Sequence, residues 1–151
     1  MKNLCNAFVT LALRWPENIS THLTWLAPLV ARIIVGQVFV TSGLGKLNNL
    51  EIATGNFISW GIPLPQILTP FVAGAEFICG ILLMLGLLTR ISAGILGVIM
   101  IVAIYTALWP ETHSIDTFFG FEEMAYLSLF LWLAIAGAGK ISVDHYLMKN
   151  C

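Results

Sequence analysis

Long runs of apolar residues alternate with short polar segments along most of the chain. Four runs pass the length test of about 20 residues that an α-helix needs to cross a bilayer. They cover residues 26–46, 66–88, 91–109 and 121–139. Because a backbone in lipid must satisfy its own hydrogen bonds, each run is expected to be helical. The pattern predicts an all-α membrane protein, a bundle of four transmembrane helices in contact with the lipid bilayer.

Composition supports the same class. Of 151 residues, 58% are hydrophobic and only 10% are charged, against about 25% charged in an ordinary soluble domain. A soluble fold of this size could not bury so much apolar surface, whereas lipid solvates it directly. The net charge of −1 and the lack of a basic cluster argue against nucleic acid as a partner.

Charged residues differ between the two ends of the predicted helices. The end that holds both termini and the turn after residue 88 is basic, with Lys2, Arg14, Arg90, Lys140 and Lys149. The opposite end is mainly acidic, with Lys46, Glu51, Glu111, Asp116, Glu122 and Glu123. The positive-inside rule therefore predicts that both termini are cytoplasmic and that the loops 47–65 and 110–120 face outward.

Residues 1–25 form a segment of different character. Leu4, Phe8, Leu11 and Trp15 fall on one helical face, and no small-residue cleavage site of a signal peptide follows them. This pattern suits an amphipathic helix that lies in the membrane interface. Residues 26–151 are then expected to form one membrane domain.

A carboxylate lies in the middle of the second predicted helix. An ionised group at that depth costs about 2.5–3.5 kcal/mol on insertion scales, so Glu76 is expected to have a partner or a function. Arg32 lies about 9 Å from the cytoplasmic end of its helix and Glu76 about 18 Å, which two long side chains can bridge. We therefore expect Arg32 to pair with Glu76, and Lys46 to pair with Glu122 or Glu123 at the outer boundary.

Two interpretations of these charges stay open. They are structural ion pairs that hold the bundle together, or they form a polar site for protons, a quinone headgroup or a small polar solute. His22, His113 and His145 lie outside the predicted helices, which argues against an intramembrane haem. No Cys-x-x-Cys motif occurs, so no metal site is expected.

Several short motifs recur in a recognisable order. Arg32 is followed by Gly36, Phe39, the pair 42–43 and Lys46; next come the Gly-Ile-Pro-Leu-Pro turn at 61–65, Glu76, Gly80, and the segments 86–90 and 137–144. In order and spacing, residues 29–144 resemble the DoxX family of small four-helix proteins of the bacterial inner membrane. The resemblance implies that location, with several membrane passes.

The resemblance also implies a function. Similar chains are described as membrane subunits of a thiosulfate:quinone oxidoreductase or of redox complexes that respond to oxidative stress. The expectation for this chain is a membrane subunit or accessory of a quinone-linked redox complex, with quinone as its cofactor and other proteins as partners. It would be an enzyme only as part of such a complex.

Under this reading, Glu76 and Arg32 are the candidate catalytic residues at a proton or quinone site. Lys46, Glu123 and Tyr126 are the candidate binding residues nearer the outward face. Two alternatives stay open: a transporter of protons or small solutes that acts as a homo-oligomer, and a non-catalytic assembly or structural protein.

Overall fold

The computed structural model describes residues 23–109 and 120–150, and every regular element within these ranges is a helix. The helices are α3 (Leu26–Asn48), α4 (Leu50–Ser59), α5 (Pro65–Leu85), α6 (Thr89–Ala103), the π-helix η2 (Ile104–Leu108), α8 (Glu122–Ala136) and α9 (Val143–Asn150). The predicted all-α class is confirmed. Most of the predicted interfacial segment 1–25, and nearly all of the loop 110–120, lie outside the described residues.

Three helices are long and apolar enough to cross a membrane: α3, α5, and the continuous helix that α6 forms with η2. They correspond to the predicted runs 26–46, 66–88 and 91–109. Helix α8 corresponds to the fourth run but has 15 residues, or about 22 Å, against a hydrocarbon core of about 30 Å. It ends early because Gly137, with φ of 83°, leaves the helical conformation.

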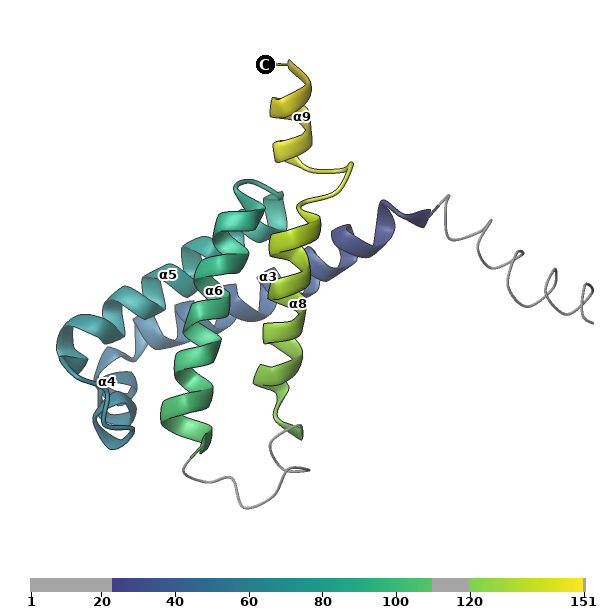
Figure 1. Ribbon diagram of the computed structural model, residues 1–151. Coiled ribbons are helices and arrows are strands. Elements are labelled where there is room, and N and C mark those ends of the chain that lie inside the picture. Colours follow the sequence, from purple (N-terminus) through teal and green to yellow (C-terminus); the bar gives the residue numbers. More distant parts are fainter. Residues whose placement is uncertain (1–22, 110–119, 151) are drawn as a thin grey trace, which may run out of the picture.

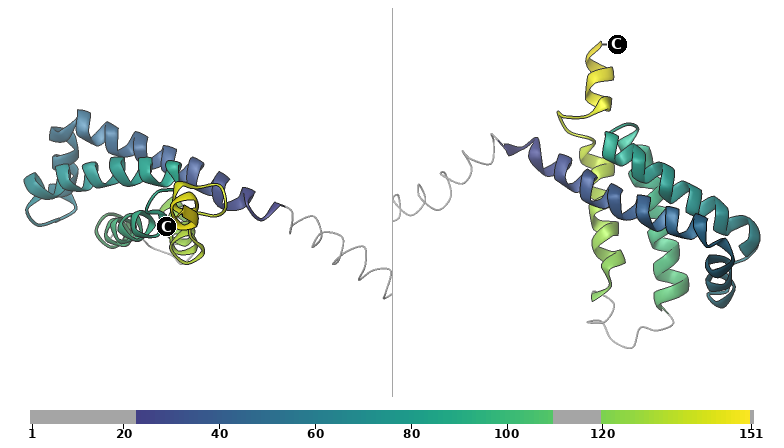
Figure 2. Two further views of the ribbon diagram at one scale, coloured as in Figure 1. Left: turned by 90° about the horizontal axis from the view of Figure 1, so that it is seen from above. Right: turned by 180° about the vertical axis from the view of Figure 1, so that it is seen from behind.

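The long helices form two crossed pairs (Figures 1 and 2). Helices α3 and α5 lie antiparallel in one pair, and α6 and α8 form the second. Contacts between α5 and α6, which a tight turn joins, link the pairs. Helix α4 lies against the start of α5, and α9 projects beyond the opposite end of the molecule.

Small residues let α3 and α5 approach closely. A Cβ atom added to Gly43 would lie 2.5 Å from the backbone nitrogen of Phe77 and 2.7 Å from the carbonyl oxygen of Ala73. A Cβ atom on Gly80 would lie 2.8 Å from the backbone nitrogen of Val40. Since backbone atoms on both sides occupy this space, the two glycines set the distance and the register between the helices.

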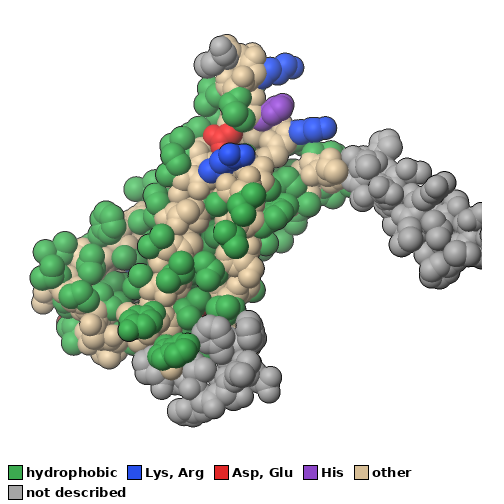
Figure 3. Space-filling model, in the orientation of Figure 1, with side chains coloured by type: hydrophobic (Ala, Val, Ile, Leu, Met, Phe, Trp, Pro, Cys, Tyr) green, Lys and Arg blue, Asp and Glu red, His purple; other side chains and the backbone are tan. Residues whose placement is uncertain are grey.

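An apolar core fills the crossing of the two pairs. Its buried residues include Val35 and Phe39 of α3, Leu83 of α5, Leu96 of α6, and Phe130 and Leu133 of α8. Large apolar side chains also cover the outside of the helices, whereas on the face shown the charged groups gather at one end (Figure 3). Such a surface is suited to lipid rather than to water.

The predicted outer loop 47–65 contains a helix that the sequence analysis did not anticipate. In α4, Ala53 and Phe57 are buried, while Ile52 and Ile58 are 68% and 59% exposed. The spacing of four between Ala53 and Phe57 was the available signal, because residues four apart share a helical face. The exposed isoleucines leave an apolar surface on α4 that is suited to lipid rather than to water.

The glycine contact between α3 and α5 is testable. Gly43→Ala should lower the stability of the protein by about 1–3 kcal/mol, because its methyl group would overlap backbone atoms that cannot move aside. Gly45→Ala on the same helix is the matched control, since nothing lies within 4 Å of the added Cβ; it should be neutral or slightly stabilising. Thermal unfolding in detergent measures both, and equal midpoints would contradict the tight contact.

Candidate functional site

Glu76 lies on the face of α5 that packs against α3, and it is 1% exposed. Its two carboxylate oxygens lie 2.5 Å and 2.6 Å from the Nζ atom of Lys46. The hydroxyl of Ser42 also donates a hydrogen bond, of 3.0 Å, to Oε2 of Glu76. The carboxylate is therefore neutralised and hydrogen-bonded entirely by α3.

The helical register explains which groups meet. Ser42 and Lys46 are one turn apart on α3, and Gly43 between them contacts the backbone at Phe77, next to Glu76. The side chains on either side of this contact consequently point into the same narrow space. Lys46 is more accessible than Glu76, because its side chain is 30% exposed and that of Glu76 only 2%.

The predicted pair between Arg32 and Glu76 is wrong. Arg32 lies eleven residues before Gly43, or about 16 Å along the helix, and therefore far from the level of Glu76. The predicted pair required the ends of the two predicted helices to lie at the same depth. In the structure Arg32, rather than the start of α3, lies level with Gly86 at the end of α5.

Arg32 instead joins three segments at the other end of the molecule. It is 1% exposed, and its guanidinium donates hydrogen bonds to the carbonyl oxygens of Pro28 (3.2 Å) and Ile141 (2.5 Å). A Cβ atom on Gly86 would collide with its Nη1 atom. The space for this buried arginine exists only because residue 86 is glycine, which also adopts a φ of 69° there.

Asp144 completes this junction. Its carboxylate accepts hydrogen bonds from the backbone nitrogens of Leu88 (2.7 Å) and Thr89 (2.9 Å), and its own backbone nitrogen donates to Gly86 (2.9 Å). A carboxylate at the start of a helix satisfies free N–H groups and interacts favourably with the helix dipole. Asp144 thus caps α6 from the first turn of α9, beside Leu88, whose φ is 49°.

The remaining candidate residues lie on α8. The ring of Tyr126 packs edge-on against Phe39 at a centroid distance of 5.7 Å, and its hydroxyl donates to Glu122 (3.1 Å). Phe39 precedes Ser42 by one turn, so Tyr126 lies near the ion pair without touching it. Within the described ranges no ion pair joins Lys46 to Glu122 or Glu123, and that predicted pairing is wrong because Glu76 engages the lysine.

The structure adds two polar residues to those chosen from the sequence. Ser42 was part of a recognised motif, and its position one turn before Lys46 was the signal for a role at the pair. Asp144 had no comparable signal, because its partners are backbone groups more than fifty residues away. Among the residues that the structure covers, no group of three or more His, Cys, Asp or Glu side chains is arranged to hold a metal ion.

Chemically, the group formed by Ser42, Lys46 and Glu76 is suited to exchanging a proton. The carboxylate accepts, the ammonium and hydroxyl groups donate, and all three meet within hydrogen-bonding distance. The partly exposed Lys46 connects the buried carboxylate with the surface.

Comparisons with known proteins agree on one family. The sequence profile of the DoxX family matches residues 27–109. The "Uncharacterized membrane protein Rv3486" of Mycobacterium tuberculosis is 32% identical over 130 residues, covering 79% of this chain and 80% of that protein. The "Putative oxidoreductase CatD" of Bacillus subtilis is 31% identical over 127 residues, covering 83% and 90%.

A third relative is the "Inner membrane protein YqjF" of Escherichia coli, 27% identical over 122 residues, which cover 81% of this chain and 92% of that protein. No solved structure matches the chain significantly. The relatives therefore support the membrane location, and none contributes an experimental fold.

The pairing of Glu76 predicts a specific pattern of coupling. Glu76→Gln and Lys46→Gln should be non-additive by about 0.5–3 kcal/mol, whereas Glu76→Gln and Arg32→Gln should add within about 0.5 kcal/mol. Lys46→Gln should cost more than Glu76→Gln, because it leaves a buried carboxylate, whereas a lone lysine can extend toward water. Unfolding of each single and double variant in detergent measures these terms, and coupling of Glu76 to Arg32 alone would contradict the assignment.

Proposed function

The chain belongs to the DoxX family of membrane proteins, and from this premise we propose that it is the membrane subunit of a quinone-linked redox complex in the bacterial inner membrane. The observation that carries the proposal is the buried ion pair between Lys46 and Glu76, open to the surface on the lysine side. Charges inside membrane helices are costly and are usually functional. The name of the Bacillus subtilis relative supports the redox direction.

The donor set fits a quinone headgroup. A quinone carbonyl oxygen is a hydrogen-bond acceptor, and Lys46 and Ser42 present an ammonium and a hydroxyl donor in one place. Apolar side chains surround the site, as a lipid-soluble ligand requires. Lys46 and Ser42 would hold the headgroup, and the aromatic contact of Tyr126 with Phe39 would form part of the neighbouring wall.

Within this proposal, each residue has a separate task. A quinone, when bound, supplies the exchange of two electrons and two protons between its oxidised and reduced forms. Glu76 would hold one proton at a carboxylate oxygen, and Lys46 would stabilise the carboxylate once that proton has left. Arg32 would act only as a positioning residue, through the placement of α3 against α5. Glu123, at the start of α8, would influence polar groups approaching from outside.

Electron transfer then requires a protein partner that supplies or accepts the electrons. Such a partner would bind this subunit within a membrane complex. A second copy of the chain is a further candidate partner, as expected from the sequence.

A transporter for protons or small solutes would use the same charges but needs access from both sides of the membrane. The pair is reached through Lys46, whereas Glu76 and the neighbouring residues of α5, Ala73 and Gly80, are buried. One-sided access favours a binding site over a continuous pathway. The exposure of Lys46 also favours a functional site, because a purely structural ion pair does not require an exposed lysine.

We propose further that α8 completes a fourth membrane crossing and that both termini are cytoplasmic. Two contacts support this: a Cβ on Gly139 would meet Pro28, and Arg32 binds the carbonyl of Ile141. The segment after α8 therefore returns to the end where α3 begins. Within the described ranges this end carries Arg90, Lys140 and Lys149, as the positive-inside rule requires of a cytoplasmic side.

The orientation can be tested with reporter fusions. An alkaline phosphatase reporter, active only outside the cytoplasm, should be inactive when fused after Cys151 and active when inserted in the loop 110–120. The same fusions with a cytoplasmic reporter should give the opposite result. Activity of the phosphatase at the C-terminus alone would reverse the orientation, and activity at both positions would overturn the fourth crossing.

The functional proposal predicts the effect of changing Glu76. In membranes of the native host, Glu76→Gln should lower quinone-dependent oxidation about 100-fold, the lower range for loss of a general acid or base. Glu76→Asp should retain part of the activity, because it keeps a carboxylate. Oxidant sensitivity of the cells is the second measurement.

Glu51→Gln is the control, since Glu51 is an exposed carboxylate on α4 that is not part of the pair. It should behave as the wild type. Immunoblots of membrane fractions must show equal insertion of all variants. Wild-type activity in an inserted Glu76→Gln variant would show that the pair is structural, whereas proton or solute flux in proteoliposomes without quinone would favour the transporter.

A further inference from the structure

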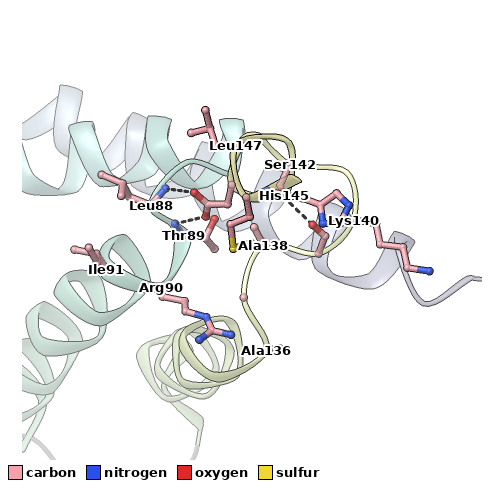
Figure 4. A pocket seen from close by; sticks show the side chains of 14 residues that line it. Leu88, Thr89, Arg90, Ile91, Ala136, Ala138, Lys140, Ser142, His145 and Leu147 are labelled. Carbon is pink, nitrogen blue, oxygen red and sulfur yellow. Dashed lines mark hydrogen bonds between the residues drawn. The ribbon is translucent and has the colours of Figure 1, made fainter. Parts of the chain in front are cut away.

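A cavity of about 630 Å³ lies at the end of the molecule opposite the Lys46–Glu76 pair. It is formed by the start of α6, the segment that follows α8, and the start of α9 (Figure 4). None of the candidate residues from the sequence analysis lines it. Its lining contains both basic and apolar side chains, and each kind limits the chemistry of the ligand that could bind.

The charged lining is effectively cationic. Arg90, Lys140 and His145 are the basic residues, and Asp144 is the acid. Both oxygens of Asp144 already accept backbone hydrogen bonds at the start of α6. The helix N-terminus is thereby occupied, and the two cations Arg90 and Lys140 outnumber the single carboxylate of the lining.

Arg90 is the most favourably placed of these groups. It extends from the start of α6 toward the end of α8, beside Ala136 (Figure 4). A Cβ atom on Gly137 would lie 3.3 Å from its Nε atom, so the glycine leaves room for the guanidinium beside the backbone. Arg90 forms no hydrogen bond or ion pair with the residues that the structure describes, and Lys140 extends away from it on the far side of the segment.

The apolar lining continues onto the surface of α6. Leu88 and Ile91, both at the cavity, are 50% and 59% exposed. Ile95 and Val98 follow Ile91 by one and two turns and are 42% and 60% exposed. These residues form a continuous apolar stripe that begins at the cavity and runs along the membrane-facing side of the helix.

We propose that this cavity binds the headgroup of an anionic phospholipid. The phosphate would bind Arg90, whose planar guanidinium suits paired phosphate oxygens. One acyl chain would lie along the stripe from Ile91 to Val98, and Lys140 and His145 would contribute a weaker attraction at the rim. A free phosphate ion would use the guanidinium but leave the stripe without a partner, so the stripe assigns the site to a lipid.

Native mass spectrometry of the full chain in detergent tests the site, with added phosphatidylglycerol or phosphatidylcholine. Wild-type protein should retain phosphatidylglycerol preferentially. Arg90→Gln should lower the retained fraction about tenfold, the effect of one charge-assisted contact. Arg90→Lys should restore part of it, and Lys140→Gln should have a smaller effect than Arg90→Gln.

Lys149→Gln is the matched control, because Lys149 lies on α9 and does not line the cavity. It should bind lipid as the wild type does. Phosphatidylglycerol should also raise the thermal midpoint of the wild type and of Lys149→Gln but not that of Arg90→Gln, provided that all three have equal midpoints without lipid. If Arg90→Gln is less stable without lipid, the comparison of Lys140→Gln with Lys149→Gln decides.

Three results would overturn the proposal. Equal retention of the two lipids would remove the requirement for anionic charge. Equal retention by the Arg90→Gln and Lys149→Gln variants would place the lipid elsewhere. Displacement of the lipid by millimolar inorganic phosphate would show a site for free anions.

Discussion

The structure depends on the close approach of α3 and α5. Gly43 and Gly80 bring backbone against backbone at two levels, so neither helix can slide along the other without a collision. This contact sets the register, and the register decides which polar groups meet. Glu76 comes to lie opposite Ser42 and Lys46, and Arg32 comes to lie beside the turn that follows α5.

Within the described ranges, two charged side chains are buried, and they are accommodated in different ways. Glu76 is neutralised by a lysine that remains partly exposed, so its pair stays reachable from the surface. Arg32 donates hydrogen bonds to two backbone carbonyl groups, leaves Nη1 without a partner among the described residues, and lies in a junction that Asp144 completes. Burying a charge is unfavourable unless it is paired and hydrogen-bonded. The first arrangement leaves the lysine partly exposed, whereas the second connects α3, α6 and the start of α9.

These two arrangements lie at opposite ends of the protein. The Lys46–Glu76 pair lies near the end with α4, and the cavity beside Arg90 lies at the end with α9. The junction formed by Arg32 and Asp144 builds one wall of that cavity, because Asp144 is among its lining residues. A polar ligand at one end and a lipid headgroup at the other would therefore contact separate surfaces. The crossed helix pairs between them form the apolar core.

The sequence by itself determined the helical class, the family, and three helices long and apolar enough to cross a membrane, close to their observed bounds. These features depend on length, hydrophobicity and local motifs, all of which are read along one segment at a time. Only the tertiary structure decided the partners of Glu76 and Arg32, because partners depend on the register between helices. It also decided that α8 ends at Gly137, where a glycine with a φ of 83° interrupts a run of apolar residues that continues beyond it in the sequence. An error of a few residues in the level of two helices is enough to exchange one ion pair for another, since each residue advances a helix by about 1.5 Å.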